Sequence, residues 1–311
     1  MEGSADVSMV SKPPAATLAW AAQAVGDGAA VTSVQPLHGG SSSAVYAMDV
    51  TDSEGRVHEL VLRRFTNAKW LAEEPDLAEH EAAALGVAAK VAVPAPRLVA
   101  FDPKPEHGDV PLVLMTRLRG GVYLAPRDLE PWLGQLAGTL AMIHGAEGEA
   151  IGWEYVPWFH VENMCVPEWA AQRAPWEALF DRVRAGAPPA RRVFLHRDYH
   201  PGNILFNRAK VSGVVDWVNG CMGPLEVDVS HCRANLAVLH GMEAADAFDR
   251  AYRARTGAPP ADPYWDAAQV ADAANGDFAG LLTFNTYGVE LTAEGIQARL
   301  DEFARAAAAR L

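Results

Sequence analysis

The chain has 311 residues, half of them hydrophobic, and a formal net charge of −13. This length allows one large domain or two moderate lobes. The acidic balance argues against a nucleic-acid partner, because phosphate backbones attract basic surfaces, and it mildly favours a cationic substrate. No run is apolar for long enough to cross a bilayer, and residues 1–13 are interpreted as a disordered start. We therefore expect a cytoplasmic protein with no membrane partner.

The first third of the chain is rich in strand patterns. Alternating apolar residues and β-branched content predict a three-stranded meander, followed by a helix and two further strands, the first of which is an edge strand because of its prolines. The segments, in chain order, are helix 14–25, strands 30–37, 38–50 and 56–65, helix 75–89, edge segment 91–103 and buried strand 110–118.

The character of the chain changes after Gly120-Gly121. Apolar positions at helical spacing predict helices over 127–145 and 166–186, and from about Asp228 the chain is mostly helical. The sequence thus predicts an α+β protein with a β-rich N-lobe over 14–117 and a mainly helical C-lobe over 118–311.

A polar motif, "HRDYHPGNILF", runs directly into a predicted hairpin. Two apolar runs, 204–207 and 212–216, are separated by a polar turn. If Ile204 faces Val215 in this hairpin, Asn203 faces Asp216 at about 5 Å. An amide oxygen and a carboxylate at that distance suit Mg²⁺, which takes a few oxygen ligands and bridges to substrate phosphates.

Asp198 lies five positions before Asn203 on the same loop. A carboxylate there can accept the proton of a hydroxyl group while a metal holds a phosphoryl donor, and phosphoryl transfer needs little more than such positioning and charge neutralisation. His196 is expected to brace the loop through hydrogen bonds to the backbone.

These motifs resemble those of the aminoglycoside phosphotransferase and choline-kinase-like family, which are small-molecule kinases with the protein-kinase fold. The pattern is His-x-Asp-x4-Asn, an apolar strand and then Asp. The resemblance implies that Asp198 is the catalytic base and that Asn203 and Asp216 hold Mg²⁺. The segment "GPLEVDVSH" resembles a downstream family segment in which Asp228 would hold the backbone of the catalytic loop.

The resemblance extends in order through the first third of the chain. "LHGGSSSAVYAM" is similar to the nucleotide loop, so that Ser41, Ser42 and Ser43 would offer donors to phosphate oxygens. Arg63 matches the basic residue of the third strand, although Arg64 on the opposite face is the alternative. Glu81 matches the helix glutamate that pairs with that basic residue.

"LVLMTRL" resembles the strand that leads into the hinge, so backbone groups from Thr116 to Leu118 would meet a purine. Two positions depart from the family: Arg197 stands where a small residue is usual, and His200 stands where many protein kinases have lysine. A protein kinase is excluded because no G-x-G-x-x-G-x-V loop is present, and Trp-Val rather than Phe-Gly follows Asp216.

The acceptor is expected beside residues 152–178, which are rich in Trp and Glu. Trp153 and Trp158 are the pocket candidates, whereas Trp169 and Trp176, seven apart on one predicted helix, are expected in the core. We predict a kinase that uses ATP or GTP and Mg²⁺ to phosphorylate a hydroxyl group of an antibiotic or a metabolite. The alternatives are a non-catalytic nucleotide-binding relative that acts as a sensor or scaffold, and a metal-dependent hydrolase.

Overall fold

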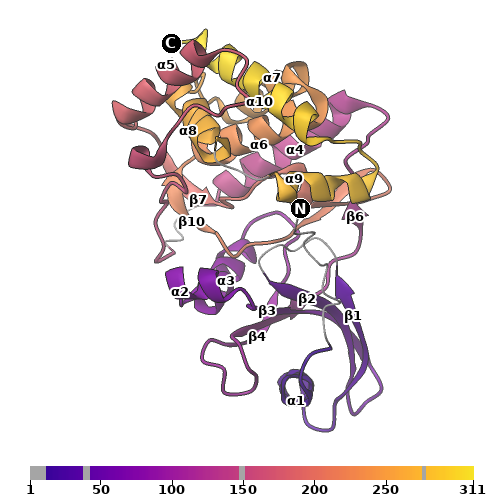
Figure 1. Cartoon of the computed structure of the whole chain (residues 1–311). Coiled ribbons are helices and arrows are strands. Elements are labelled where there is room, and N and C mark those ends of the chain that lie inside the picture. Colours follow the sequence, from indigo (N-terminus) through magenta and orange to yellow (C-terminus); the bar gives the residue numbers. More distant parts are fainter. Residues whose placement is uncertain (1–11, 38–42, 147–150, 275–277) are drawn as a thin grey trace. The chain divides into compact units, whose positions relative to one another are not determined.

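The computed structural model describes residues 12–37, 43–146, 151–274 and 278–311, and Figure 1 shows their helices and strands. The chain forms two compact units. The N-lobe is Met1–Gly86 with Pro96–Arg117, and the C-lobe is Val87–Ala95 with Leu118–Leu311. Residues 87–95 group with the C-lobe, where the carbonyl of Pro94 accepts a 2.9 Å hydrogen bond from Val214.

The N-lobe contains one antiparallel sheet in the order β1-β2-β3-β5-β4. The predicted meander is confirmed, and the proline-flanked segment forms an edge strand. The elements of this part of the chain are α1 Ala15–Val25, β1 Ala30–Leu37, β2 Ala44–Thr51, β3 Val57–Arg64, α2 Ala68–Glu73, α3 Leu77–Ala88, β4 Leu98–Asp102 and β5 Leu112–Thr116.

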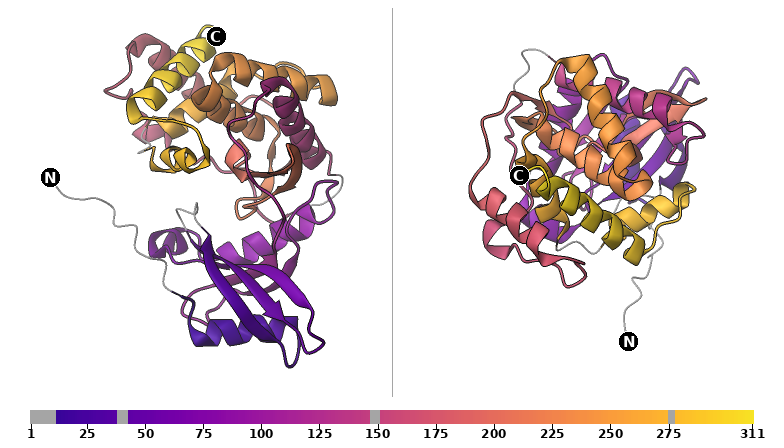
Figure 2. Two further views of the ribbon diagram at one scale, coloured as in Figure 1. Left: turned by 90° about the vertical axis from the view of Figure 1, so that its right-hand side faces the viewer. Right: turned by 90° about the horizontal axis from the view of Figure 1, so that it is seen from above.

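Alternate residues of three strands form the core of the N-lobe. Met48 of β2, Leu60 and Leu62 of β3 and Leu114 of β5 are buried in one cluster with Ala21 of α1. Because side chains alternate between the faces of a strand, this face of the sheet is the one that packs on α1. Figure 2 shows α1 lying along it. The even-numbered residues of β3 therefore point toward α1, and the odd-numbered ones point to the other face.

The C-lobe is mainly helical and carries short strands around the predicted catalytic loop (Figure 1). Within the described ranges, no helix is long and apolar enough to span a membrane. The elements are β6 Gly121–Val122, α4 Leu129–His144, α5 Arg173–Arg184, β7 Arg192–Leu195, β8 Ile204–Asn207, β9 Lys210–Val214, β10 Cys221–Pro224, α6 Glu226–His240, α7 Met242–Thr256, α8 Pro263–Ala273, α9 Ala279–Leu282 and α10 Ala293–Ala308, with short 3-10 turns at Val161–Asn163, Pro201–Asn203 and Thr283–Tyr287.

Helix α6 lies among its neighbours α7, α8 and α10, while α4 packs on α7. The predicted apolar stripe of α4 is buried at Trp132, Leu133, Leu136, Leu140 and Ile143. The start of α6 lies next to the strand that precedes the predicted catalytic loop, because β7 pairs with β10 and β10 leads directly into α6.

The second C-lobe helix is shorter than predicted, and Trp169 lies outside it. Helix α5 begins at Arg173. Asp301 of α10 accepts hydrogen bonds from the backbone N–H of Ala171 at 3.2 Å and from the indole of Trp176 at 3.0 Å. This tertiary contact holds the preceding segment in a non-helical conformation. The two tryptophans still meet, with ring centroids 5.2 Å apart, and Trp176 is fully buried.

Candidate active site

A buried carboxylate fixes the backbone of the segment between β7 and β8. Asp228 of α6 is fully buried. Its Oδ2 accepts a 2.8 Å hydrogen bond from the N–H of His196, and its Oδ1 accepts one of 2.8 Å from the N–H of Arg197. His144 Nε2 lies 3.1 Å from the same Oδ2. Asp228 thus holds the loop's backbone, the role that the resemblance implied.

The electrostatics keep Asp228 ionised. Burial by itself would raise the pKa of this carboxyl group, but the hydrogen bond and the charge of His144 outweigh burial and hold the pKa below its ordinary value. An ionised carboxylate offers lone pairs to all three donors, so the loop is anchored by a charged acceptor rather than by a neutral one.

His196 braces a second segment, as the sequence predicted. Its ring is fully buried, and Nε2 donates a 2.9 Å hydrogen bond to the carbonyl of Val215, the residue before Asp216. Burial lowers the pKa of this imidazole, which favours the neutral ring with its proton on Nε2. His196 therefore ties the catalytic loop to the segment that carries the predicted metal ligand.

The backbone conformation at Arg197 explains why a small residue is usual at this position in the family. Its φ angle is 71°, in the left-handed region that glycine adopts freely and that costs an L-residue about 1–2 kcal/mol. The side chain offsets this cost. Its Cζ lies 3.6 Å from the ring centroid of Trp158 and 4.7 Å from that of Tyr155, and Nη2 donates to the carbonyl of Val156 at 3.2 Å.

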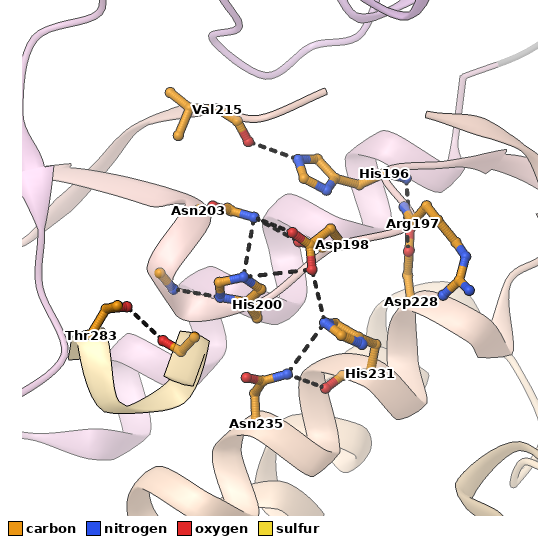
Figure 3. Close-up of polar contacts among 12 residues, drawn as sticks. His196, Arg197, Asp198, His200, Asn203, Val215, Asp228, His231, Asn235 and Thr283 are labelled. Atoms are coloured by element: carbon orange, nitrogen blue, oxygen red, sulfur yellow. Dashed lines mark hydrogen bonds and ion pairs between the residues drawn. The ribbon is translucent and has the colours of Figure 1, made fainter. Parts of the chain in front are cut away.

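Asp198 is surrounded by hydrogen-bond donors (Figure 3). Asn203 Nδ2 donates to its Oδ2 at 3.1 Å, and His231 Nε2 lies 3.1 Å from its Oδ1. His200 Nε2 lies 3.6 Å from the same oxygen. Removal from water would raise the pKa of Asp198, but the neighbouring imidazoles of His200 and His231 hold it well below its usual range. With 26% of the side chain exposed, the carboxylate can still reach a hydroxyl group.

The hydrogen bonds of His200 fix where its proton lies. Its Nδ1 faces the backbone N–H of Gly202 at 3.0 Å, and because that amide can only donate, Nδ1 accepts. The proton of the ring is therefore on Nε2, which points toward Asp198. A Cβ at position 202 would lie 2.7 Å from Phe284 and 2.8 Å from the His200 ring, so the fold-back of this ring requires glycine.

The predicted register of the hairpin is wrong by one residue. Ile204 pairs with Val214 rather than with Val215, and the carbonyl of Asn203 accepts a hydrogen bond from Val215, so Asn203 does not lie directly opposite Asp216.

The cause is a tighter turn followed by a bulge. Arg208 and Ala209 both have positive φ, as in a two-residue hairpin turn, so β9 begins at Lys210. The register then shifts at Ser212, whose hydroxyl donates to the carbonyl of Arg119 at 2.7 Å.

The residues present fit a magnesium ion. Asn203 Nδ2 contacts the carbonyl and Oδ2 of Asp198, which assigns the amide nitrogen to Asp198 and leaves Oδ1 as the available ligand atom. Asp216 has a φ of 68°, an uncommon conformation for a residue other than glycine. An amide oxygen and a carboxylate are hard ligands of the kind that Mg²⁺ prefers.

The N-lobe resolves the choice between the two neighbouring arginines of β3. Arg63 projects from the face opposite α1 and pairs with Glu81 of α3, with Nη1 3.4 Å from Oε1, and both side chains are buried. Arg64 projects from the other face, where Nη2 lies 2.5 Å from Asp109 Oδ1. This pairing raises the pKa of Arg64 against the opposing effect of burial. Arg63 is thus the partner of the helix glutamate.

Of the other residues predicted to contact the nucleotide, some lie outside the described residues. Ser41 and Ser42 lie outside the described residues, and Ser43 is half-buried before β2. Thr116 exchanges hydrogen bonds with Arg97: its N–H donates to the Arg97 carbonyl, and its Oγ1 accepts from the Arg97 N–H, both at 2.9 Å. The backbone N–H of Thr116 is therefore already hydrogen-bonded to Arg97.

Leu118 packs within the C-lobe, next to the hairpin formed by β8 and β9. A Cβ on Gly213 of β9 would lie 2.3 Å from Leu118 Cδ1, so the Leu118 side chain fills the space beside this glycine. The predicted contact of Thr116 and Leu118 with a purine stays a prediction.

The predicted acceptor segment lies against the catalytic loop at Trp158. The backbone of Trp153 pairs with Met222 of β10, which anchors the start of the segment. Trp158 stacks on Arg197, and its ring lies 5.9 Å from that of His231, edge to face, while 47% of the residue is exposed. One face of this indole therefore already contacts a cation of the protein itself.

Sequence reasoning missed His231 and Gln269. His231 lies on α6, and its Nδ1 is 3.0 Å from Gln269 Oε1 on α8. A signal was present: His231 follows Asp228 by three positions, so both lie on the side of α6 that faces the catalytic loop. The contribution of α8 leaves no local pattern in the sequence.

The chain is similar to known proteins in sequence pattern and in fold. The model of a family described as the phosphotransferase enzyme family matches residues 33–271. No curated protein sequence matches the chain. Among solved structures, that of the aminoglycoside phosphotransferase APH(4)-Ia is 18% identical with a TM-score of 0.58, and the match covers 89% of this chain and 94% of that one.

Two further structures extend the comparison. Macrolide 2'-phosphotransferase MphH from Brachybacterium faecium is 20% identical with a TM-score of 0.53, over 94% of this chain and 97% of that one. A Ralstonia eutropha JMP134 protein, provisionally described as an aminoglycoside phosphotransferase, is 18% identical with a TM-score of 0.62, over 95% and 97%. At these identities the likeness shows the fold, and it confirms the predicted kinase-like fold class.

Proposed function

Because the chain belongs to the phosphotransferase enzyme family, we propose that it transfers the γ-phosphate of ATP or GTP to a hydroxyl group of a small molecule, with Asp198 as the base. The observation that carries this proposal is the set of donors around Asp198. Asn203, His200 and His231 keep the carboxylate ionised, on a loop whose backbone Asp228 anchors.

The low pKa of Asp198 defines what this base does. A carboxylate of low basicity is a poor acceptor for a proton on a free alcohol. In a loose phosphoryl-transfer transition state, however, little proton transfer is needed before the acceptor oxygen bonds to phosphorus. Asp198 would therefore orient the hydroxyl group first and take its proton as that oxygen becomes acidic.

Asn203 Oδ1 and Asp216 would hold Mg²⁺, which when bound neutralises charge on the triphosphate. Arg63, fixed by Glu81, would contact phosphate oxygens in a fork. The acceptor class follows the solved relatives: one APH(4)-Ia structure contains ADP and hygromycin B, which supports an antibiotic-like acceptor.

A transfer screen tests the proposed function. Purified protein is incubated with γ-labelled ATP or GTP, with and without Mg²⁺, and with aminoglycosides, macrolides, amino alcohols and sugars. We expect Mg²⁺-dependent label on at least one acceptor. No transfer to any acceptor, together with no thermal shift by nucleotide and Mg²⁺, would contradict the proposal.

Replacing Asp216 by alanine removes a charged ligand and is expected to abolish the Mg²⁺-dependent part of nucleotide affinity. Calorimetric titration with nucleotide, with and without Mg²⁺, measures this part of the affinity. The matched control is Asp181→Ala on α5, whose carboxylate is 77% exposed and lies outside the site. An Asp216→Ala variant that retains the full Mg²⁺ effect would remove this residue from the metal site.

Replacing Arg63 by alanine is expected to weaken binding of the triphosphate more than binding of adenosine, because a guanidinium fork contacts phosphate oxygens rather than the base. Arg64→Ala is the control, since it removes the same group from the opposite face of β3. Calorimetry with both ligands gives the ratio of affinities for each variant. A ratio that changes in Arg64→Ala instead would reverse the assignment.

A further inference from the structure

His231 connects the base on the catalytic loop with two helices. Its Nε2 lies 3.1 Å from Asp198 Oδ1, and its Nδ1 lies 3.0 Å from Gln269 Oε1 (Figure 3 shows the first contact). Its backbone carbonyl accepts a 3.0 Å hydrogen bond from Asn235 Nδ2, which also lies 3.3 Å from Nε2. The ring is thus held on both nitrogens, and only 14% of its side chain is exposed.

The partners of His231 determine its protonation. An amide oxygen accepts only, so Nδ1 carries a proton toward Gln269. An ionised carboxylate also accepts only, so Nε2 carries a proton toward Asp198. Both nitrogens are then protonated, so the amide of Asn235 donates to the His231 backbone carbonyl and not to Nε2, and the ring is an imidazolium cation. Burial opposes this charge, but the hydrogen bond and the charge of Asp198 raise the pKa of His231.

Charged and polar groups from the catalytic loop, α6 and α8 face this ring in the described part of the chain, and several of them act on its charge. Asp198 stabilises the cation, whereas Arg197 opposes it. Asp272 of α8 is a weaker source of negative charge, because burial raises its pKa to about 6. The groups around the ring are Asp198, Arg197 and His200 of the catalytic loop, Gln269 and Asp272 of α8, Asn235 of α6 and Trp158.

A metal ion explains this cluster less well than hydrogen bonds do. One ligand atom from each of Asp198, His200 and His231 lies within 4.8 Å of the others. A metal would require the lone pair of Nε2 on both rings. The Gly202 amide places the proton of His200 on Nε2, so metal binding there would break that hydrogen bond. His231 is therefore better explained as a donor to Asp198, and His200 as a neutral ring whose Nε2 proton faces the same carboxylate oxygen from 3.6 Å.

We propose that His231 is a positioning residue whose imidazolium holds the Asp198 carboxylate in its reactive rotamer, with Gln269 orienting the ring. This inference rests on the proposed kinase function. The protonation of His231 would make the activity of the site depend on pH. The cation is present below the raised pKa of His231 and is lost as pH rises through that pKa, so kcat is expected to fall there.

Two substitutions separate the hydrogen bond from the charge. In His231→Gln the amide nitrogen can replace Nε2 as a donor at every pH, so most of kcat is expected to remain and the decline at high pH to disappear. In His231→Leu the hydrogen bond and the charge are both lost, and kcat is expected to fall about tenfold or more. This loss is a part of the roughly 10²–10⁴-fold contribution that a positioned base makes to the rate. The affinity for nucleotide is expected to stay unchanged in both.

The control is His240→Gln, the same change on the same helix outside the site, where His240 packs on Trp132. It is expected to keep the wild-type pH profile. A merely structural His231 would change stability without changing the pH profile. A His231→Gln variant with the same decline at high pH as the wild type would overturn the proposal.

A second measurement does not depend on finding the acceptor. Nitrogen NMR of the histidine rings is expected to show His231 doubly protonated at pH 7 in the wild type and neutral in Asp198→Asn, where the balancing charge is gone. A neutral His231 in the wild type would refute the inference even if phosphate is transferred. If the ring is charged but no acceptor is phosphorylated and nucleotide with Mg²⁺ gives no thermal shift, the pairing stands and the kinase proposal fails.

Discussion

Replacing Asp198 by asparagine is expected to lower kcat by about 10²- to 10⁴-fold, the range for loss of a general base, while nucleotide affinity is largely kept. The amide has the size of the carboxyl group but accepts no proton. The loop itself should stay in place, because its backbone is held by Asp228 and not by this side chain. Steady-state kinetics with an acceptor from the screen, together with calorimetry with Mg²⁺-nucleotide, measures both quantities.

The control for this substitution is Asp181→Asn, the same change at an exposed carboxylate of α5. It should leave kcat unchanged. If Asp198→Asn retained full activity, Asp198 would have no part in the mechanism, whatever its hydrogen bonds. If it lost nucleotide affinity as well as kcat, the residue would be supporting the metal site rather than acting as the base.

Replacing Asp228 by alanine is expected to destabilise the C-lobe by about 3–5 kcal/mol, the usual cost of removing one partner of a buried ion pair. The change leaves three donors without their acceptor: the backbone N–H groups of His196 and Arg197, and His144. Asp228→Asn keeps one acceptor oxygen, so a smaller loss is expected. Denaturant unfolding, followed by tryptophan fluorescence, measures the free energy of unfolding of each variant.

The pH dependence of this stabilisation has a definite sign. The folded pKa of Asp228 is lowered, so its contribution is present above the unfolded pKa and lost as pH falls through the folded pKa. The difference between the wild type and Asp228→Asn should therefore be constant near neutral pH and shrink below about pH 4. Asp249→Ala, which breaks a surface pair with Arg253 on α7, should cost less than about 1 kcal/mol. An equal loss of unfolding free energy in Asp228→Ala and Asp249→Ala would contradict the anchoring role of Asp228.

Much of the fold was predictable because local patterns determine it. The meander β1 to β3 follows from alternation, and α4 follows from the spacing of its buried leucines. Helix α5 was predicted too long because Asp301, far along the chain, binds the segment before it. Helix propensity carries no information about such a distant acceptor.

The part of the site that one short segment contains was predictable from the residues of that segment. Asp198 and Asn203 lie five residues apart on one loop, and the structure brings them into contact. The register of the hairpin was predicted wrongly because the bulge at Ser212 depends on the Arg119 carbonyl, which no pattern within the hairpin shows. The pairing of Arg63 rather than Arg64 with Glu81 required knowing which face of β3 packs on α1.

The sequence by itself located a carboxylate, an amide and a second carboxylate within one short stretch, and the resemblance of this stretch to a kinase family indicated phosphoryl transfer. Only the tertiary structure decided the state of the base. The pKa of Asp198 depends on His231 and His200, and His231 in turn on Gln269 of another helix. Electrostatic interactions act through space, so groups distant in the chain set the charge and orientation of a residue that the sequence could only locate.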